Sequence, residues 1–197
     1  MKRLFYVTLL AIAIPAGAIA GLGLTRAGLE TPKYKVVERK SGFEIRNYPT
    51  LPVVSTKMSA AASRQQQDAR FMRLFRYIDK GNSASQKISM TTPVFMESGG
   101  SSGAMSFFIP DEVSEAGAPK PKEGAVYLNE IRGGKYAVMR FRGGRSGSAE
   151  RRAVEALTKA IEAAGIKKAD GDPLFAYYDP PWTPKMLRRN EVLMRLK

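Results

Sequence analysis

The stretch Tyr178-Asp179-Pro180-Pro181-Trp182-Thr183-Pro184, followed by Arg188-Arg189-Asn190-Glu191-Val192, joins a proline-rich loop to the start of a final strand. Each proline fixes φ at about −65° and lacks a backbone N–H, so the loop is stiff and cannot pair as a central strand. Trp182, the only tryptophan, lies on this loop with Lys185 and Met186 close behind it. The residues alone predict either one wall of a ligand site or a structural corner with Trp182 buried in the core.

Missing residue types limit the chemistry of the chain. The 197 residues include no histidine and no cysteine, which excludes Cys/His metal sites, cysteine nucleophiles, histidine-based triads and the usual His ligand of haem iron. Lys and Arg number 32 against 18 Asp and Glu, and the net charge of +14 favours anionic partners such as carboxylates, phosphates or an acidic membrane. No motif for nucleic-acid binding is present, so we expect no nucleic-acid partner.

The N-terminal segment predicts export. Met1-Lys2-Arg3 precedes 21 uncharged residues, from Leu4 to Leu24, whose apolar first part is followed by Pro15 and small residues. This order is typical of a secretory signal peptide, and the length also suffices for an uncleaved membrane anchor. We therefore expect residues 1–29 to be a signal peptide or an anchor, with residues 4–24 as the tether. The body is then periplasmic or membrane-anchored outside the cytoplasm.

Residues 30–197 are expected to form one domain of two similar halves, about 31–110 and 125–197. The first half predicts strands near 34–38, 43–48, 53–58, 88–97 and 105–109, with a helix over 60–80. The second predicts strands near 126–131, 136–141, 174–178 and 191–196, with a helix from 146 or 148 to 164. Residues 110–124 read as the linker between them. Because neither half can bury both faces of its elements, the halves should pack into one α+β unit.

Several motifs resemble the SOUL family of haem-binding proteins. Tyr178–Pro181 with Arg188–Val192 is similar to the family's C-terminus, Lys87–Val94 with Met105–Pro110 to its middle, and Tyr34–Arg39 to its opening strand. The resemblance covers about residues 31–197. It implies two βαββ-type pseudo-repeats that form a distorted antiparallel β-barrel flanked by two helices. It also implies non-enzymatic, non-covalent binding of haem or a related tetrapyrrole, for haem buffering or transport.

The resemblance places the ligand in a shallow groove between the first helix and the loop carrying Pro180–Met186. At about 100° per residue, the apolar arc of that helix extends past its core face toward Phe75 and Met72, and Arg73 should point into solvent. The apolar strip ends at the cation Arg76. An apolar surface bordered by a cation fits a flat apolar ring with carboxylates at its rim. The candidate groove residues are Arg64, Phe71, Met72, Phe75, Arg76, Trp182, Lys185 and Met186. Met72 and Arg76 also fit an ordinary exposed surface.

The chain departs from the family at the iron. Some members are thought to use a histidine near the first helix, where this chain reads Ser63-Arg64-Gln65-Gln66-Gln67-Asp68. Binding must then rely on apolar contact and pairing with carboxylates, or on Tyr77 or Met72 as the ligand to iron.

Two other functions are consistent with the sequence. One is a small-molecule enzyme on the same duplicated fold, in which a carboxylate and a tyrosine do acid–base work. Its candidates are Glu97, Glu130, Tyr127 and Tyr178. The other is a membrane-tethered interaction protein whose basic body meets acidic lipid.

Overall fold

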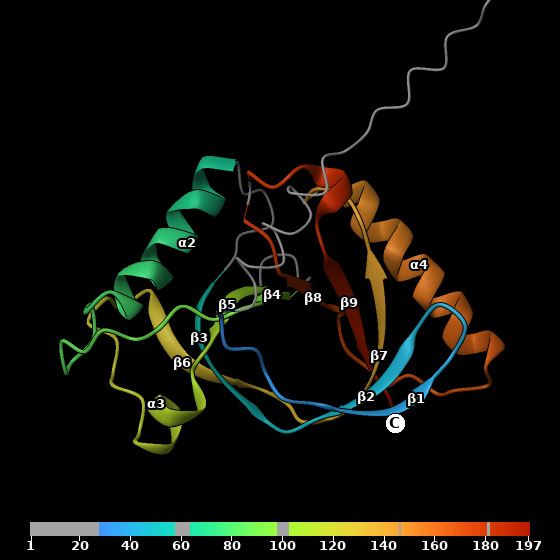
Figure 1. The fold of residues 1–197 in the computed structure, drawn as a ribbon, viewed down its shortest axis with the longest axis horizontal. Coiled ribbons are helices and arrows are strands. Elements are labelled where there is room, and N and C mark those ends of the chain that lie inside the picture. The colour runs from blue at the N-terminus through green and yellow to red at the C-terminus, as the bar shows by residue number, and fades with distance from the viewer. Residues whose placement is uncertain (1–27, 58–63, 98–102, 146, 181) are drawn as a thin grey trace, which may run out of the picture.

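A curled antiparallel sheet of nine strands forms the body of the protein (Figure 1). The computed structural model describes residues 28–57, 64–97, 103–145, 147–180 and 182–197. The strands are β1 (Lys35–Arg39), β2 (Glu44–Tyr48), β3 (Leu51–Lys57), β4 (Val94–Glu97), β5 (Ala104–Phe108), β6 (Val126–Ile131), β7 (Gly134–Phe141), β8 (Leu174–Tyr177) and β9 (Asn190–Arg195). The helices are α2 (Arg64–Ile78), α3 (Asp111–Glu115), α4 (Gly147–Ala163) and the short 3₁₀ helix η2 (Lys185–Leu187).

The two long helices cover one face of the sheet. Helix α2 contacts β3, β5 and β6, and helix α4 contacts β7 and β9. Side chains of a strand alternate between faces, so Val192 and Met194 of β9 join Leu74 of α2 and Leu157 of α4 in one core. Leu193 lies on the opposite face with a second apolar cluster. The sheet is therefore buried on both faces.

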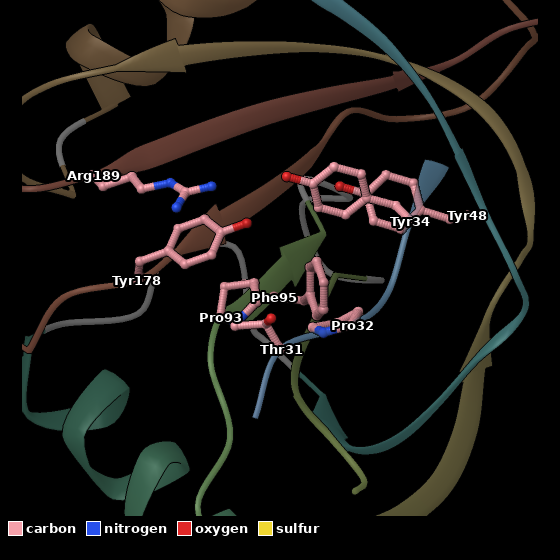
Figure 2. A pocket seen from close by; sticks show the side chains of 8 residues that line it. All are labelled: Thr31, Pro32, Tyr34, Tyr48, Pro93, Phe95, Tyr178 and Arg189. Atoms are coloured by element: carbon pink, nitrogen blue, oxygen red, sulfur yellow. The ribbon is translucent and has the colours of Figure 1, made fainter. Parts of the chain in front are cut away.

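The face opposite the helices is the inside of the curl. Tyr48 in β2 and Phe95 in β4 lie four positions apart in the strand order β1-β2-β7-β9-β8-β4-β5-β3-β6. A flat sheet would separate these two strands by roughly 19 Å, at about 4.8 Å per strand. Both residues nevertheless line a single cavity of about 100 Å³ (Figure 2). The sheet therefore bends toward this inner face, and the helices cover its outer face.

The α+β class and the antiparallel sheet agree with the prediction from the sequence. The predicted barrel, however, is not closed. Strands β1 and β6 stand at the two ends of the strand order, and no ladder joins them among the described residues. The sheet is thus an open half-barrel. Strand β1 has five residues, of which four are exposed, and a short, charged strand is suited to a solvent-facing edge.

Apart from the edge strand β1, the strand order is symmetric about the β4–β8 pair. Strands β5, β3 and β6 follow on one side, and β9, β7 and β2 on the other. Strand β2 pairs with β7, and β6 pairs with β3, so each half lends a strand to the other. The order is compatible with two βαββ-type repeats, and the duplication itself stays a prediction.

The strand expected over residues 88–97 is shorter than predicted. Strand β4 begins at Val94, because the preceding segment is bound to other parts of the chain. Ile88 donates its backbone N–H to the carbonyl of Ile78 at 2.8 Å, and Thr92 donates to Glu30 at 2.9 Å. Pro93 has no N–H to give to a ladder.

The linker expected over 110–124 contains a helix that the sequence reading missed. Helix α3 begins after Pro110 and carries Asp111 and Glu112 in its first turn. A proline followed by acids is a helix-start pattern, since the acids complement the N-terminal end of the helix dipole. This makes three α-helices among the described residues rather than two.

Helix α2 ends at Ile78, two residues before the predicted end, and Gly81 follows it as the stop. Gly81 donates its N–H to the carbonyl of Arg76 at 2.7 Å, and a Cβ at position 81 would lie 2.4 Å from that oxygen. Only glycine tolerates so close an approach. The expected start of this helix, residues 60–63, lies outside the described residues.

The described residues contain no helix that is both long and apolar enough to span a membrane. The predicted signal peptide or tether at residues 4–24 lies outside them.

Candidate functional site

The apolar flank of α2 is partly exposed. Phe71 is half-buried and packs edge-on against Phe107 of β5, with ring centroids 5.1 Å apart. The ring of Phe75 stacks on Phe71 at 6.4 Å. Phe75 is 40% exposed and Met72 is 44% exposed. A continuous apolar strip therefore runs from the outer core to solvent along this helix.

Two cations of α2 pair with Glu123 of the segment before β6. Arg73 Nε is 3.5 Å from a carboxylate oxygen of Glu123, and Arg76 Nη1 is 3.9 Å from the other oxygen. Arg73 is 40% exposed, and it pairs with Glu123 because the segment before β6 folds back against α2. Arg76 remains exposed, so it can still meet a ligand carboxylate at the solvent edge of the helix. The side chain of Arg64 lies outside the described ones.

The loop after β8 is exposed at its aromatic tip. Trp182 is 82% exposed and Met186 is 64% exposed. The alternative of Trp182 as a buried core residue is therefore wrong. Large apolar side chains this exposed are typical of a binding surface when they gather in a patch.

The rest of the loop is fixed by hydrogen bonds. Thr183 is buried and donates its N–H to the carbonyl of Pro180 at 3.1 Å. Arg188 Nε donates to the carbonyl of Thr183 at 2.7 Å. The carbonyl of Lys185 accepts the N–H of Gly143 at 3.1 Å, which ties the loop to the end of β7. In Figure 1 the loop runs along the same edge of the molecule as one end of α2.

A cluster of buried charged side chains, which was not predicted from the sequence, lies on the inner face of the sheet. Glu191 of β9 is fully buried, and its carboxylate binds Arg46 of β2 at 2.8 and 3.2 Å. It also accepts from Arg189 at 2.9 Å and from Arg140 at 3.3 Å. Arg46 donates as well to Glu44 at 2.8 Å. Three guanidinium groups thus surround one buried carboxylate.

These contacts determine the ionisation of the pair. Burial alone would raise the pKa of Glu191, but the hydrogen bonds and charges of Arg46 and Arg189 hold it below its usual value. Burial alone would lower the pKa of Arg46, but Glu191 raises it above its usual value. Both groups are therefore charged in the folded protein at neutral pH.

Tyrosines enclose the ion cluster. Tyr178 donates its hydroxyl proton to Glu191 at 2.9 Å, and the guanidinium of Arg189 lies 4.1 Å from the centre of its ring. Arg46 lies 4.4 Å from the ring centre of Tyr34 and donates to the hydroxyl of Tyr48 at 3.2 Å. Burial raises the pKa of Tyr48 to about 12, so its hydroxyl keeps its proton.

The sequence carried a weak signal for this cluster. Charges of opposite sign alternate along β2 (Glu44, Arg46) and along the entry to β9 (Arg189, Glu191). Such alternation ordinarily indicates the solvent-facing side of a strand. Only the curl of the sheet shows that the two charged sides face each other.

The residues considered for an enzyme do not converge. Burial, with a smaller effect from Asp172, raises the pKa of Glu97. Burial also raises the pKa of Tyr127, and the charge of Glu97 adds to that shift, so these two lie within electrostatic reach. Tyr178 belongs instead to the Glu191 cluster, and Glu130 is exposed on β6. The described residues hold no group of three or more metal-ligating acids.

Solved structures with the same fold have low sequence identity. The C-terminal domain of EcmrR is 14% identical, covers 83% of this chain and 98% of its own length, and has a TM-score of 0.56. A hydrolase from Listeria innocua is 13% identical, covers 82% of this chain and 94% of its own length, and also has a TM-score of 0.56. At such identities the likeness shows the fold alone. No curated protein matches the chain.

The family is established by the sequence itself. The sequence model of the SOUL heme-binding protein family matches residues 29–195, which is nearly the whole of the body. The match includes α2, the proline-rich loop and the strands that join them, and it confirms the resemblance seen in the motifs. The chain belongs to the SOUL heme-binding protein family.

Proposed function

We propose that the protein binds haem or a related tetrapyrrole, non-covalently and without a histidine ligand, between α2 and the loop of residues 180–186. Family membership supports the ligand class. The observation that carries the location is the exposure of large apolar side chains on both proposed walls. Met72 and Phe75 are exposed on α2, and Trp182 and Met186 are exposed on the loop. The binding is proposed to serve haem buffering or transport, with no catalysis.

The residues present fit such a ligand. Phe71, Phe75 and Met72 offer an apolar surface to a flat ring, and Trp182 offers an aromatic face opposite it. Arg76 and Lys185 are exposed cations on the two walls, and either can pair with a propionate. The chain has no histidine, so contact with the ring and its carboxylates must supply the affinity. The same walls accept a metal-free porphyrin.

Trp182 gives a direct test because it is the only tryptophan. We expect haemin to quench its fluorescence saturably, with a parallel change in the Soret band. Met72→Ala and Met186→Ala should each weaken binding, by roughly tenfold if the thioether side chain is buried by the ligand. Leu128→Ala is the matched control, since Leu128 is as exposed as Phe75 but lies on β6. Equal weakening by the control, or quenching without saturation, contradicts the proposed groove.

We also propose that the protein is exported through residues 1–29. The support is the order of charges, apolar residues and small residues in that segment. Mass analysis of the protein recovered from expressing cells distinguishes a cleaved signal peptide from an anchor, and a full-length product in the cytosolic fraction contradicts export.

A further inference from the structure

The inner face of the sheet contains a cavity that the proposed tetrapyrrole groove does not use. Figure 2 shows Tyr178 and Arg189 on one side, Tyr34 and Tyr48 on the other, and Phe95 between them. Thr31, Pro32 and Pro93 complete its lining. We propose that this cavity is a second ligand site, for a small aromatic carboxylate with a single ring.

The volume determines the size of the ligand. The cavity measures about 100 Å³, on the scale of the roughly 150 Å³ cavity that binds benzene in an engineered protein core. One six-membered ring fills such a space, with its substituent at the opening. A tetrapyrrole is several times too large, so the site is distinct from the groove beside α2.

The charges favour an anion. The cluster behind the cavity contains four cations, Arg39, Arg46, Arg140 and Arg189, against two carboxylates, Glu44 and Glu191, which leaves two net positive charges. Each of the two flanking tyrosines already holds a guanidinium against its ring, which disfavours a second cation beside it. Arg46 lies against Tyr34 at 4.4 Å, and Arg189 lies against Tyr178 at 4.1 Å.

Two hydrogen-bond donors remain for a carboxylate. Arg189 uses Nε and Nη2 to bind Glu191, and among the described residues its Nη1 has no hydrogen-bond acceptor. Its side chain is 30% exposed, so this edge can be reached. Tyr48 accepts from Arg46, which leaves its own hydroxyl proton to donate. Hydrogen bonds from a guanidinium to a carboxylate are stronger than those between neutral groups, so Arg189 supplies most of the attraction and Tyr48 a second contact.

The remaining lining is apolar and receives the ring. Phe95 is 2% exposed and belongs to the inner core, and Pro32 and Pro93 flank it. A polar ligand without a ring would leave these surfaces in contact with water. The site therefore selects for a carboxylate attached to a flat apolar body, as in benzoate.

Benzoate is the probe, with benzyl alcohol and benzylamine as its neutral and cationic counterparts. Calorimetric titration of the full chain should give saturable benzoate binding, with weaker binding of the alcohol and none of the amine. Arg189→Gln removes the charged donor and should weaken benzoate by roughly 10- to 100-fold. Thr31→Phe is independent of the ion cluster, because it fills the opening from an exposed position, and it should abolish binding in a protein with wild-type circular dichroism.

The outcomes separate this site from the tetrapyrrole groove. Thr31→Phe should leave haemin quenching of Trp182 unchanged. If the wild-type protein binds benzoate but not haemin, only the proposed tetrapyrrole groove is overturned. The inner site is overturned if benzoate does not saturate the folded wild type, if benzylamine binds as well as benzoate, or if Thr31→Phe binds benzoate normally.

Discussion

At the scale of single residues, the Arg46–Glu191 pair is the most demanding feature of the fold. Both side chains are almost completely buried, with exposed fractions of 1% and 0%. Desolvation of two charges is compensated only when every lone pair and proton finds a partner. Arg189, Tyr178 and Tyr48 supply the additional hydrogen bonds here. The pair is thus a network whose members should not act independently.

A double-mutant cycle tests that coupling. Glu191→Gln leaves buried guanidinium groups without their carboxylate and should lower the free energy of unfolding by about 3–5 kcal/mol. The double variant Arg46→Met/Glu191→Met should lose less unfolding free energy than the sum of the losses in Arg46→Met and Glu191→Met. In the double variant neither member of the pair leaves the charge of the other unpaired. Urea unfolding provides the measurement. Lys33→Ala, which breaks the exposed pair with Asp111, is the control and should change little. Strict additivity would contradict the network.

The partly buried carboxyl of Glu97 should make the stability of the fold depend on pH. Burial raises its pKa above the usual value near 4.5 in the folded protein. A carboxyl whose folded pKa is raised favours folding when it is protonated, and this contribution is lost as pH rises above about 4.5 toward the raised value. Glu97→Gln should therefore raise the unfolding free energy at pH 7 and have little effect at pH 3.5. Thermal unfolding across that range checks the sign, and stabilisation that is equal at both pH values contradicts it.

At the scale of helices and strands, a prediction succeeded where neighbouring residues determine the element and failed where distant residues do. The strand over 126–131 was predicted at both of its ends, because alternation and flanking turn residues are local properties. The start of β4 was placed too early because non-local hydrogen bonds hold residues 88–92. The partner of Arg73 was missed for a similar reason, since Glu123 reaches it from another segment. Helix α3 was missed because its capping pattern lay inside an apparent linker.

Edge strand β1 gives a prediction at this scale. Its register is interrupted between Val36 and Glu38, and Lys35 and Arg39 are exposed. A bulge and charges both discourage pairing with another molecule. Lys35→Val should therefore increase self-association, as measured by light scattering at rising concentration. Lys57→Val is the matched control, because β3 already has partners on both sides. Equal association of the two variants would show that the edge is protected in another way.

At the scale of the whole molecule, composition, the family motifs and strand patterning were enough to predict an α+β domain with an antiparallel sheet. They were not enough to predict which polar side chains lie inside. Arg46 and Glu191 look like surface residues in their own strands. They become interior residues only because the sheet bends. The two walls of the candidate groove were predicted separately, and the large apolar side chains on both of them are exposed.

The position of β9 in the sheet also constrains how the chain folds. It follows all the other described strands in sequence, yet it lies between β7 and β8 near the middle of the sheet. The carboxylate of Glu191 in β9 binds Arg46 of β2, which is 145 positions earlier in the chain. Contacts of such sequence separation form late and slowly. A ribosome must therefore release nearly the whole domain before the sheet can assemble, and until then the nascent chain stays open to chaperones and to transport across a membrane in an unfolded form.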